Sequence, residues 1–361
     1  MLPHIMRSSV NWRPYIVMAP TSDPSIIPAL SAAYSDSGIT TFFGVNNFFN
    51  SNIKIDIMHI HWPEELFGWS APTDQQIELG EKKIKEWKSR TKIVATVHNL
   101  PPHCGWTKNM KLWFSIIYQN SHMITHFSNY SYVEFIKEFP NLSSSLHLVH
   151  NPHTFRAAPF DRRVSREHLG LGEDDFSILV LGQIRHESEL SLILKSFRHA
   201  RIDHKQISII CRLPGSKGWR GAITRRFLRL KVQGHSVFGS IQFDEKYVED
   251  IKMSILLGGS DALFIYRQPP QINSGLLSLG MEAGLPIVAP DYGAFSEYLS
   301  TGENELFVPG DGYSAGEALS RIFLKCNNKL ARISLSNDNR NISKKWGWGQ
   351  VIDSVTSRLS A

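Results

Sequence analysis

Short apolar runs alternate with amphipathic stretches along most of the chain, and no other feature of the sequence constrains its fold as strongly. In the first half, apolar runs predict strands over residues 15–19, 40–45, 57–60, 92–97, 123–127 and 146–149, and amphipathic stretches predict helices over 26–34, 74–88 and 112–119. Strands that alternate with helices are typical of a parallel sheet covered by helices. The first half therefore predicts an α/β domain built on a parallel sheet.

The pattern breaks at His150-Asn151-Pro152-His153 and then starts again. A residue before a proline is disfavoured in a helix, and the next dozen residues are charged and irregular. Beyond them we predict strands over 176–181, 206–211, 236–238, 262–266 and 286–289, and helices over 190–200, 247–257 and 275–283. Since 361 residues suit two domains, we predict one over residues 1–155 and another over 156–340. In such sheets ligands bind beyond the carboxyl ends of the strands.

Cysteine usage and hydropathy predict a cytoplasmic protein. The three cysteines (Cys104, Cys211 and Cys326) are far apart and outside any CxxC spacing, which argues against a disulfide framework or a zinc site. The N-terminus has no apolar segment typical of a signal peptide. The longest apolar stretch, residues 251–266, is shorter than a membrane span requires.

The net charge of +6 predicts attraction to phosphate, whether in nucleotides, in nucleic acid or at an anionic membrane surface. Basic and apolar residues gather over residues 217–231, where a solvated helix face is the favoured interpretation. A patch facing the inner leaflet is the alternative, and it would make the protein peripheral on the plasma membrane. Nucleic acid is disfavoured because no recognised nucleic-acid module accompanies the charge.

A predicted strand ends at Tyr266-Arg267, and after a loop rich in proline Asn273-Ser274-Gly275 opens a helix. Free N–H groups at a helix start attract anions, and a glycine lets a phosphate approach closely. The hydroxyl of Ser274 would add a donor. Asparagine and serine are also common helix caps, so this motif alone has an ordinary structural interpretation.

The order of segments in the second half resembles glycosyltransferase family 4 enzymes of the GT-B type. The similarity rests on residues 179–196, 236–269, 274–289, 302–309 and 346–359. This resemblance implies two Rossmann-like α/β domains that face each other across a cleft, with a C-terminal helix (about 341–361) crossing back to the first domain. It implies that the first domain binds the acceptor and that the second binds a nucleotide-sugar donor.

The chain departs from the family pattern at three positions. The two glutamates that the family carries around the diphosphate-binding helix correspond here to Gln271 and Leu279, and the usual lysine corresponds to Ser188, which leaves Arg185 as the cation in that loop. We therefore expect the donor to be held differently. The expected donor and diphosphate contacts are Gly182, Arg185, Tyr266, Arg267, Ser274, Gly275 and Leu276.

Two segments of the first domain, His59-Ile60-His61-Trp62-Pro63-Glu64-Glu65 and the stretch from Val97-His98-Asn99 to His103, resemble a bacterial exopolysaccharide transferase subgroup. An inverting transferase needs a base for the proton of the acceptor hydroxyl. Glu64 is the first candidate and His98 the second, although His98 could instead hold the donor. The expected acceptor or sugar contacts are His61, Trp62, Asn99 and His103. His59 lies inside a predicted strand, in the alternating pattern of that strand, and this position predicts a structural role for its side chain.

The resemblance implies transfer of a hexose-type sugar from a GDP- or UDP-linked donor to a saccharide acceptor carried on a lipid, in bacterial surface or exopolysaccharide synthesis. We expect no cofactor and no metal: the sequence has no Asp-x-Asp motif, and the spacing of His98 and His103 is not that of helical ligands. The alternative is a catalytically degenerate GT-B protein that binds sugar nucleotides or serves as a partner subunit. An epimerase of the same fold is a minor option, and the absence of GxGxxG after the first strand disfavours a Rossmann dehydrogenase.

Overall fold

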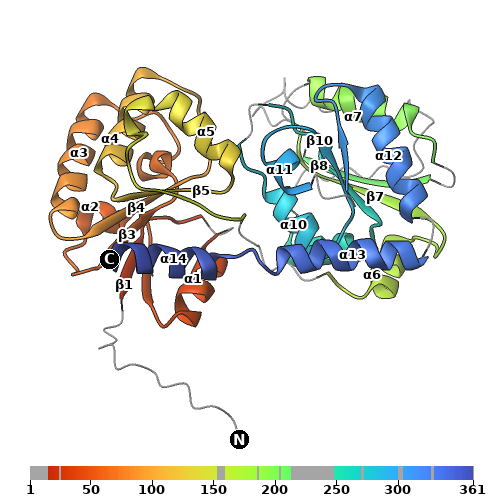
Figure 1. Cartoon of the computed structure of the whole chain (residues 1–361), viewed down its shortest axis with the longest axis horizontal. Helices are drawn as coiled ribbons and strands as arrows, with labels where there is room; N and C mark the ends of the chain where they lie inside the picture. Colours follow the sequence, from red (N-terminus) through yellow and green to blue (C-terminus); the bar gives the residue numbers. More distant parts are fainter. Residues whose placement is uncertain are drawn as a thin grey trace, which may run out of the picture.

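The computed structural model describes residues 15–23, 26–152, 159–184, 187–202, 205–212, 248–269, 272–299, 304–326 and 329–360. They form two parallel sheets, each covered by helices (Figure 1). The first has the order β2-β1-β3-β4-β5-β6. Its strands are β1 (Ile16–Ala19), β2 (Thr40–Phe43), β3 (Ile57–Ile60), β4 (Lys92–Val97), β5 (Met123–His126) and β6 (His147–Val149).

The helices of this first domain lie on both faces of its sheet. They are α1 (Ile27–Asp36), α2 (Asn46–Asn50), α3 (Asp74–Lys88), α4 (Lys108–Asn120) and α5 (Asn129–Glu138), with 3₁₀ turns η1 (Pro63–Phe67) and η2 (Pro140–Leu142). Successive residues of a strand face opposite sides of the sheet. Accordingly, Ile93 of β4 belongs to the core beneath α3 and α4, and Val94 belongs to the core on the α1 side. Burial of both faces explains the uninterrupted apolar runs of the sequence.

The second sheet has the order β11-β10-β9-β7-β8, and all its pairings are parallel. Its strands are β7 (Phe176–Gln183), β8 (Lys205–Arg212), β9 (Ala262–Phe264), β10 (Ile287–Pro290) and β11 (Glu305–Phe307). Its helices are α6 (Arg162–Leu169), α7 (Glu187–His199), α9 (Asp250–Gly259), α10 (Gly275–Ala283), α11 (Gly293–Leu299), α12 (Gly312–Cys326) and α13 (Lys329–Ser343). Val180 and Leu181 of β7 again point into two separate cores.

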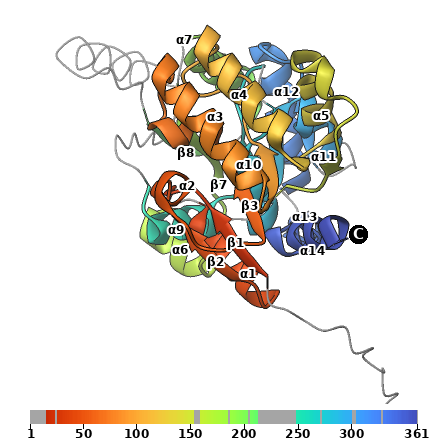
Figure 2. The same ribbon diagram turned by 90° about the vertical axis from the view of Figure 1, so that its left-hand side faces the viewer.

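The last helix, α14 (Trp348–Ser360), returns to the first domain, as predicted. Its residues Trp348, Val351, Ile352 and Val355 belong to the same core as Leu30 of α1. Figure 1 shows α13 below the second domain and α14 continuing below the first, and Figure 2 shows α14 and α1 on the side of the first sheet away from α3 and α4. The two-domain α/β architecture that the alternation predicted is therefore confirmed.

The differences from the predicted elements concern mainly polar helices. The charged stretch after residue 160 was predicted to be irregular, but it forms α6. Helices α5 and α13 were not predicted, because polar residues dilute their apolar faces, and α11 was not predicted because seven residues are too few to show a helical period. The predicted strand over 236–238 and the basic segment 217–231 lie outside the described residues.

Candidate active site

Two histidines predicted to follow neighbouring strands lie together at the carboxyl ends of β3 and β4. The Nδ1 atom of His61 lies 3.1 Å from Nε2 of His98, and both side chains are buried. The ring of Trp62 packs against that of His98, with centroids 4.2 Å apart and the ring planes tilted by 30°. Trp348 of α14 packs edge-on against His61 at 5.2 Å, so the returning helix supports this cluster from beneath.

Glu64, the first candidate for the base, lies in η1 with a side chain only 1% exposed. Its Oε1 atom is 3.1 Å from Nδ1 of His103, whose own side chain is half exposed. The Nδ2 atom of Asn99 lies 3.1 Å from the same nitrogen of His103. The structure thus joins three predicted site residues, and His103 links a buried carboxylate to the surface. A carboxylate in this setting can accept a proton directly or through the imidazole.

Glu65 has a different role from its neighbour. Its carboxylate accepts hydrogen bonds from Thr21 Oγ1 and from the backbone N–H of Ser22, each at 2.6 Å. These bonds attach the loop after β1 to η1. Burial is the main cause that raises the pKa of Glu65, while the two hydrogen bonds act in the opposite direction. Glu65 is therefore a structural residue of the site.

Trp69 belongs to the site but was not predicted. Its backbone has φ 64°, the one positive φ outside glycine in the described chain, and such a conformation is strained for a bulky residue. The indole packs edge-on against His103 at 5.2 Å and lies 5.7 Å from Trp62. Only the preceding Gly68, which ends η1 with φ 67°, gives a sequence signal of this turn.

His59, by contrast, is a core residue, as its position within the strand predicted. Its Nδ1 lies 2.6 Å from the Tyr34 hydroxyl and its Nε2 lies 2.7 Å from Thr96 Oγ1. Burial is the main cause that lowers the pKa of His59 to about 3, and His150 adds to the effect. The ring is therefore neutral near pH 7.

In the second domain, three predicted donor contacts also lie together. Gly182, near the end of β7, has φ 103°, and a Cβ atom there would lie 2.6 Å from Nη2 of Arg267. The guanidinium of Arg267 lies 4.8 Å from the ring centroid of Tyr266. It forms a buried ion pair with Glu189 of α7, whose Oε1 is 3.1 Å from Nη1. Glu189 was not predicted as a site residue, because only the fold brings it to Arg267.

The start of α10 keeps its first-turn N–H groups outside the helical hydrogen-bond pattern. Ser274 precedes the helix, is buried, and makes no capping bond with its side chain. Gly275 and Leu276 form the first turn. Leu279, which stands where the family has a glutamate, is part of the apolar core. Arg185 and Gln271 lie outside the described residues.

Contacts between the domains link the two groups of candidates. Ile272, in the loop before α10, is 2% exposed and belongs to the core of the first domain together with Val97 and Leu100, which flank His98. In addition, the Tyr298 hydroxyl of α11 donates to the carbonyl of Phe127 at 2.7 Å. The loops that follow β4 and precede α10 therefore share one apolar cluster.

Among the described residues, no helix is both long and apolar enough to cross a membrane. Within the same part of the chain, His, Cys, Asp and Glu side chains do not gather in threes that could hold a metal ion.

No protein-family model and no curated protein sequence matches the chain. Solved structures do. HepE of Anabaena in complex with UDP-glucose is similar over 96% of this chain and 99% of its own, with a TM-score of 0.66 and 12% identity. The catalytic domain of starch synthase IV from Arabidopsis thaliana, bound to ADP and acarbose, is similar over 95% and 98%, with a TM-score of 0.65 and 13% identity. Sucrose-phosphate synthase from Thermosynechococcus elongatus is similar over 93% and 77%, with a TM-score of 0.63 and 13% identity. These likenesses show that the chain has the two-domain GT-B fold.

Proposed function

We propose that the protein is a glycosyltransferase that moves a hexose-type sugar from a UDP- or GDP-linked donor to a saccharide acceptor without a bound metal. The observation that carries the proposal is the position of Ile272 in the core of the first domain. Ile272 connects the loop that opens α10, which is the candidate diphosphate site, to the segment that contains His98. Similar structures whose names include UDP-glucose or ADP support a nucleotide-linked donor.

In this proposal the second domain neutralises the leaving diphosphate. Arg267 supplies guanidinium N–H donors, which its ion pair with Glu189 holds in place. The N–H groups of Gly275 and Leu276 and the hydroxyl of Ser274 supply donors at the positive end of the helix dipole. Gly182 leaves room beside the guanidinium, which any side chain would occupy. Arg185 is a further proposed cation.

The first domain activates the acceptor. Glu64 takes the proton from the acceptor hydroxyl. At the same time the acceptor oxygen bonds to the anomeric carbon of the donor sugar. The C–O bond between the sugar and the diphosphate breaks, and its electron pair passes to the diphosphate. His103 and Asn99 fix the carboxylate and contact the acceptor. His61, Trp62 and His98 form the wall of the site. If Glu64 only positions His103, His98 is the base.

The finer proposal is a lipid-linked acceptor in bacterial surface or exopolysaccharide synthesis, with peripheral attachment to the inner face of the plasma membrane. It rests on the net charge of +6 and on the two first-domain segments that resemble exopolysaccharide transferases. No cofactor is proposed.

Two substitutions favour a second function. Leu279 lies in the apolar core at a position where the family carries a glutamate, and Ser188 replaces the family lysine. Loss of both charged groups would suit a GT-B protein that binds sugar nucleotides without turning them over.

A thermal-shift screen tests donor binding. The purified protein is heated with UDP, GDP, ADP, CMP and their sugar conjugates, with and without EDTA. A ligand that binds only the folded state raises the melting temperature by mass action. We expect one nucleotide class to raise it equally in EDTA. If no nucleotide raises it at millimolar concentration, the transferase proposal is wrong.

A further inference from the structure

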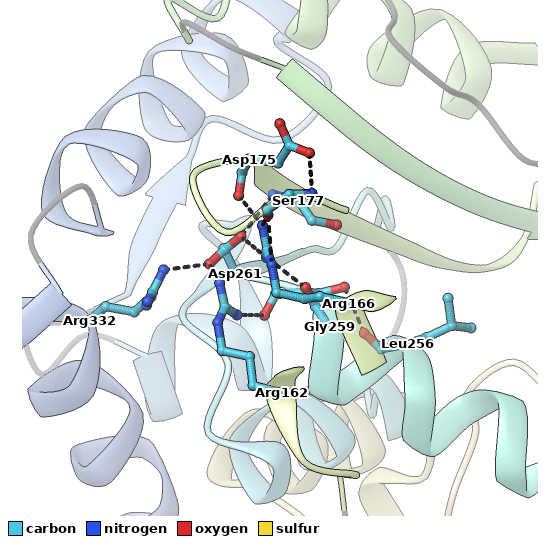
Figure 3. Close-up of polar contacts among 10 residues, drawn as sticks. Arg162, Arg166, Asp175, Ser177, Leu256, Gly259, Asp261 and Arg332 are labelled. Atoms are coloured by element: carbon cyan, nitrogen blue, oxygen red, sulfur yellow. Dashed lines mark hydrogen bonds and ion pairs between the residues drawn. The ribbon is translucent and has the colours of Figure 1, made fainter. Parts of the chain in front are cut away.

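Three arginines converge on a single carboxylate at the amino-terminal edge of the second sheet (Figure 3). Asp261 directly precedes β9, and its side chain is fully buried. Its oxygens lie 2.6 Å from Arg162 Nη2, 3.2 Å from Arg166 Nη1 and 3.0 Å from Arg332 Nη1. They also accept the backbone N–H of Ser177 at 2.9 Å. One carboxylate offsets only one of the three positive charges, so the cluster keeps a net positive charge.

The three arginines are not equivalent. The side chain of Arg166 is 5% exposed. It donates hydrogen bonds to surrounding backbone carbonyls, among them those of Gly259 and Asp175. Arg162 and Arg332 have side chains 33% and 25% exposed. Within the described residues Arg332 donates to Asp261 alone. Since a guanidinium carries five N–H donors, Arg332 keeps donors for a further acceptor.

A cavity of about 410 Å³ lies against these two arginines, between α6, the ends of α9 and α10, and α13. Its volume is within the range of small-molecule sites. Helix α13 lines it with Arg332, Ser336 and Arg340, which share one face at a spacing of four residues. Arg340 is fixed by a 3.0 Å bond from its Nη2 to the carbonyl of Ala283.

Positive charge exceeds negative charge in this cavity. Besides Asp261, its lining contains one carboxylate, Asp161, which already accepts the N–H of Val164 as the cap of α6. A neighbouring cavity shares Arg162 and Arg332 but is also lined by Glu167, Glu173, Asp174 and Asp175. Acidic groups therefore offset the arginines there, and only the first cavity suits an anion.

The crowding of guanidiniums supports the same conclusion. Burial lowers the pKa of Arg162, and the positive charges of Arg332 and Arg166 lower it further, while Asp261 acts against them. An anion in the cavity would relieve this repulsion. Its apolar walls, Phe160, Leu257 and Ile333, would contact the uncharged part of a ligand.

We propose that this cavity is a second ligand site, which binds a phosphate group of a small phosphorylated compound or of a lipid headgroup through Arg162, Arg332 and Arg340. It lies where β9 and β10 begin, whereas the proposed donor site lies where the strands end. The two sites are therefore separate, and the second does not depend on the function proposed for the first.

Calorimetric titration of the full chain with inorganic phosphate and with pyrophosphate, at constant ionic strength and with saturating UDP, tests the proposal. Flotation with phosphatidylglycerol vesicles, against phosphatidylcholine vesicles, tests the lipid source. Arg332→Gln and Arg340→Gln remove charge from the cavity. Arg163→Gln is the matched control, because Arg163 lines only the neighbouring acidic cavity. Circular dichroism and melting curves verify that each variant folds.

We expect at least one probe to bind the wild-type protein. Its affinity should be about tenfold weaker in Arg332→Gln and in Arg340→Gln, and unchanged in Arg163→Gln. Binding of phosphate or pyrophosphate without binding of the vesicles assigns a soluble phosphorylated ligand, and binding of phosphatidylglycerol vesicles but not of phosphatidylcholine vesicles assigns a headgroup. Failure of every probe to bind the wild-type protein overturns the proposal. Equal affinity in all folded variants also overturns it, because the anion would then bind elsewhere.

Discussion

Glu64 and Glu65 are neighbours in the sequence, but the structure gives them opposite tasks. Glu65 holds Thr21 and Ser22, while Glu64 contacts His103 at the surface of the site. The sequence identified the motif but could not divide these roles, because the partners are about 40 residues away in the chain. The long-range contacts of the fold therefore distinguish the structural Glu65 from the candidate base Glu64.

Glu64→Gln is therefore expected to lower kcat on the order of a hundredfold or more, which is the typical contribution of a general base. Affinity for the nucleotide should stay within twofold, because Glu64 belongs to the other domain. Initial rates and calorimetry measure the two quantities. Glu65→Gln, as control, should mainly lower the melting temperature. A near-normal rate in Glu64→Gln would move the base to His98.

Gly182→Ala tests the proposed phosphate contact in the second domain. The new Cβ atom would displace Arg267 Nη2, and the φ of 103° is unfavourable for alanine. We expect weaker nucleotide affinity and a destabilisation of about 1–3 kcal/mol. Gly170→Ala is the control, because Gly170 also has positive φ (66°) but no atom within 4 Å of its Cβ position. Equal nucleotide affinity in both variants would remove Arg267 from the donor site.

At the scale of elements, the sequence predicted best those segments whose apolar pattern is strong. The bounds predicted for α3, β3, β4 and α10 agree with the structure. In contrast, α6 reads RRVSREHL, and two of its three arginines, Arg162 and Arg166, are held by Asp261, almost 100 residues later. A helix whose stability comes from such distant polar contacts has no local apolar signature.

The returning helix α14 contributes to the site as well as to the core. Trp348 is 3% exposed and packs edge-on against His59, His61 and Phe127. Trp348→Ala should cost about 3–5 kcal/mol of unfolding free energy through loss of burial and the cavity left behind. Urea unfolding measures it. Gly349→Ala, next in the helix and with open space at its Cβ position, should leave stability nearly unchanged. A small effect of Trp348→Ala would show that α14 does not support the site.

For the whole molecule, the buried His59 and His126 and the half-buried His150 predict sensitivity to acid. Burial is the main cause that lowers the pKa of His59 and His126 to about 3 and that of His150 to about 4. The unfolded chain binds these protons at its ordinary pKa, about 6.5. Stability is therefore complete above about pH 6.5 and falls as the pH approaches the folded values.

Each of these histidines contributes a slope on the order of 1.4 kcal/mol per pH unit within that window. Urea unfolding at several pH values between about 7.5 and 4.5 measures the total. We expect His126→Gln to reduce the slope and the exposed His168→Gln to leave it unchanged. A free energy of unfolding that is independent of pH would contradict the buried neutral state.

Both domains are needed for the proposed reaction, since the base candidates belong to the first and the diphosphate site to the second. Periodicity predicted the two sheets, but not the packing of Ile272 into the first domain, which is a contact between distant segments. The position of the base candidates relative to the diphosphate site is therefore known from the structure and not from periodicity.

Transfer of labelled sugar is the most direct test of the central claim. The wild-type protein and Glu64→Gln are incubated in EDTA with labelled UDP-glucose or GDP-mannose and a mixture of free and lipid-linked saccharides, and labelled product is separated from donor. We predict transfer by the wild-type protein and at least a hundredfold less by the variant. Donor binding without any transfer by the wild-type protein would contradict the claim and favour the non-catalytic sugar-nucleotide binder.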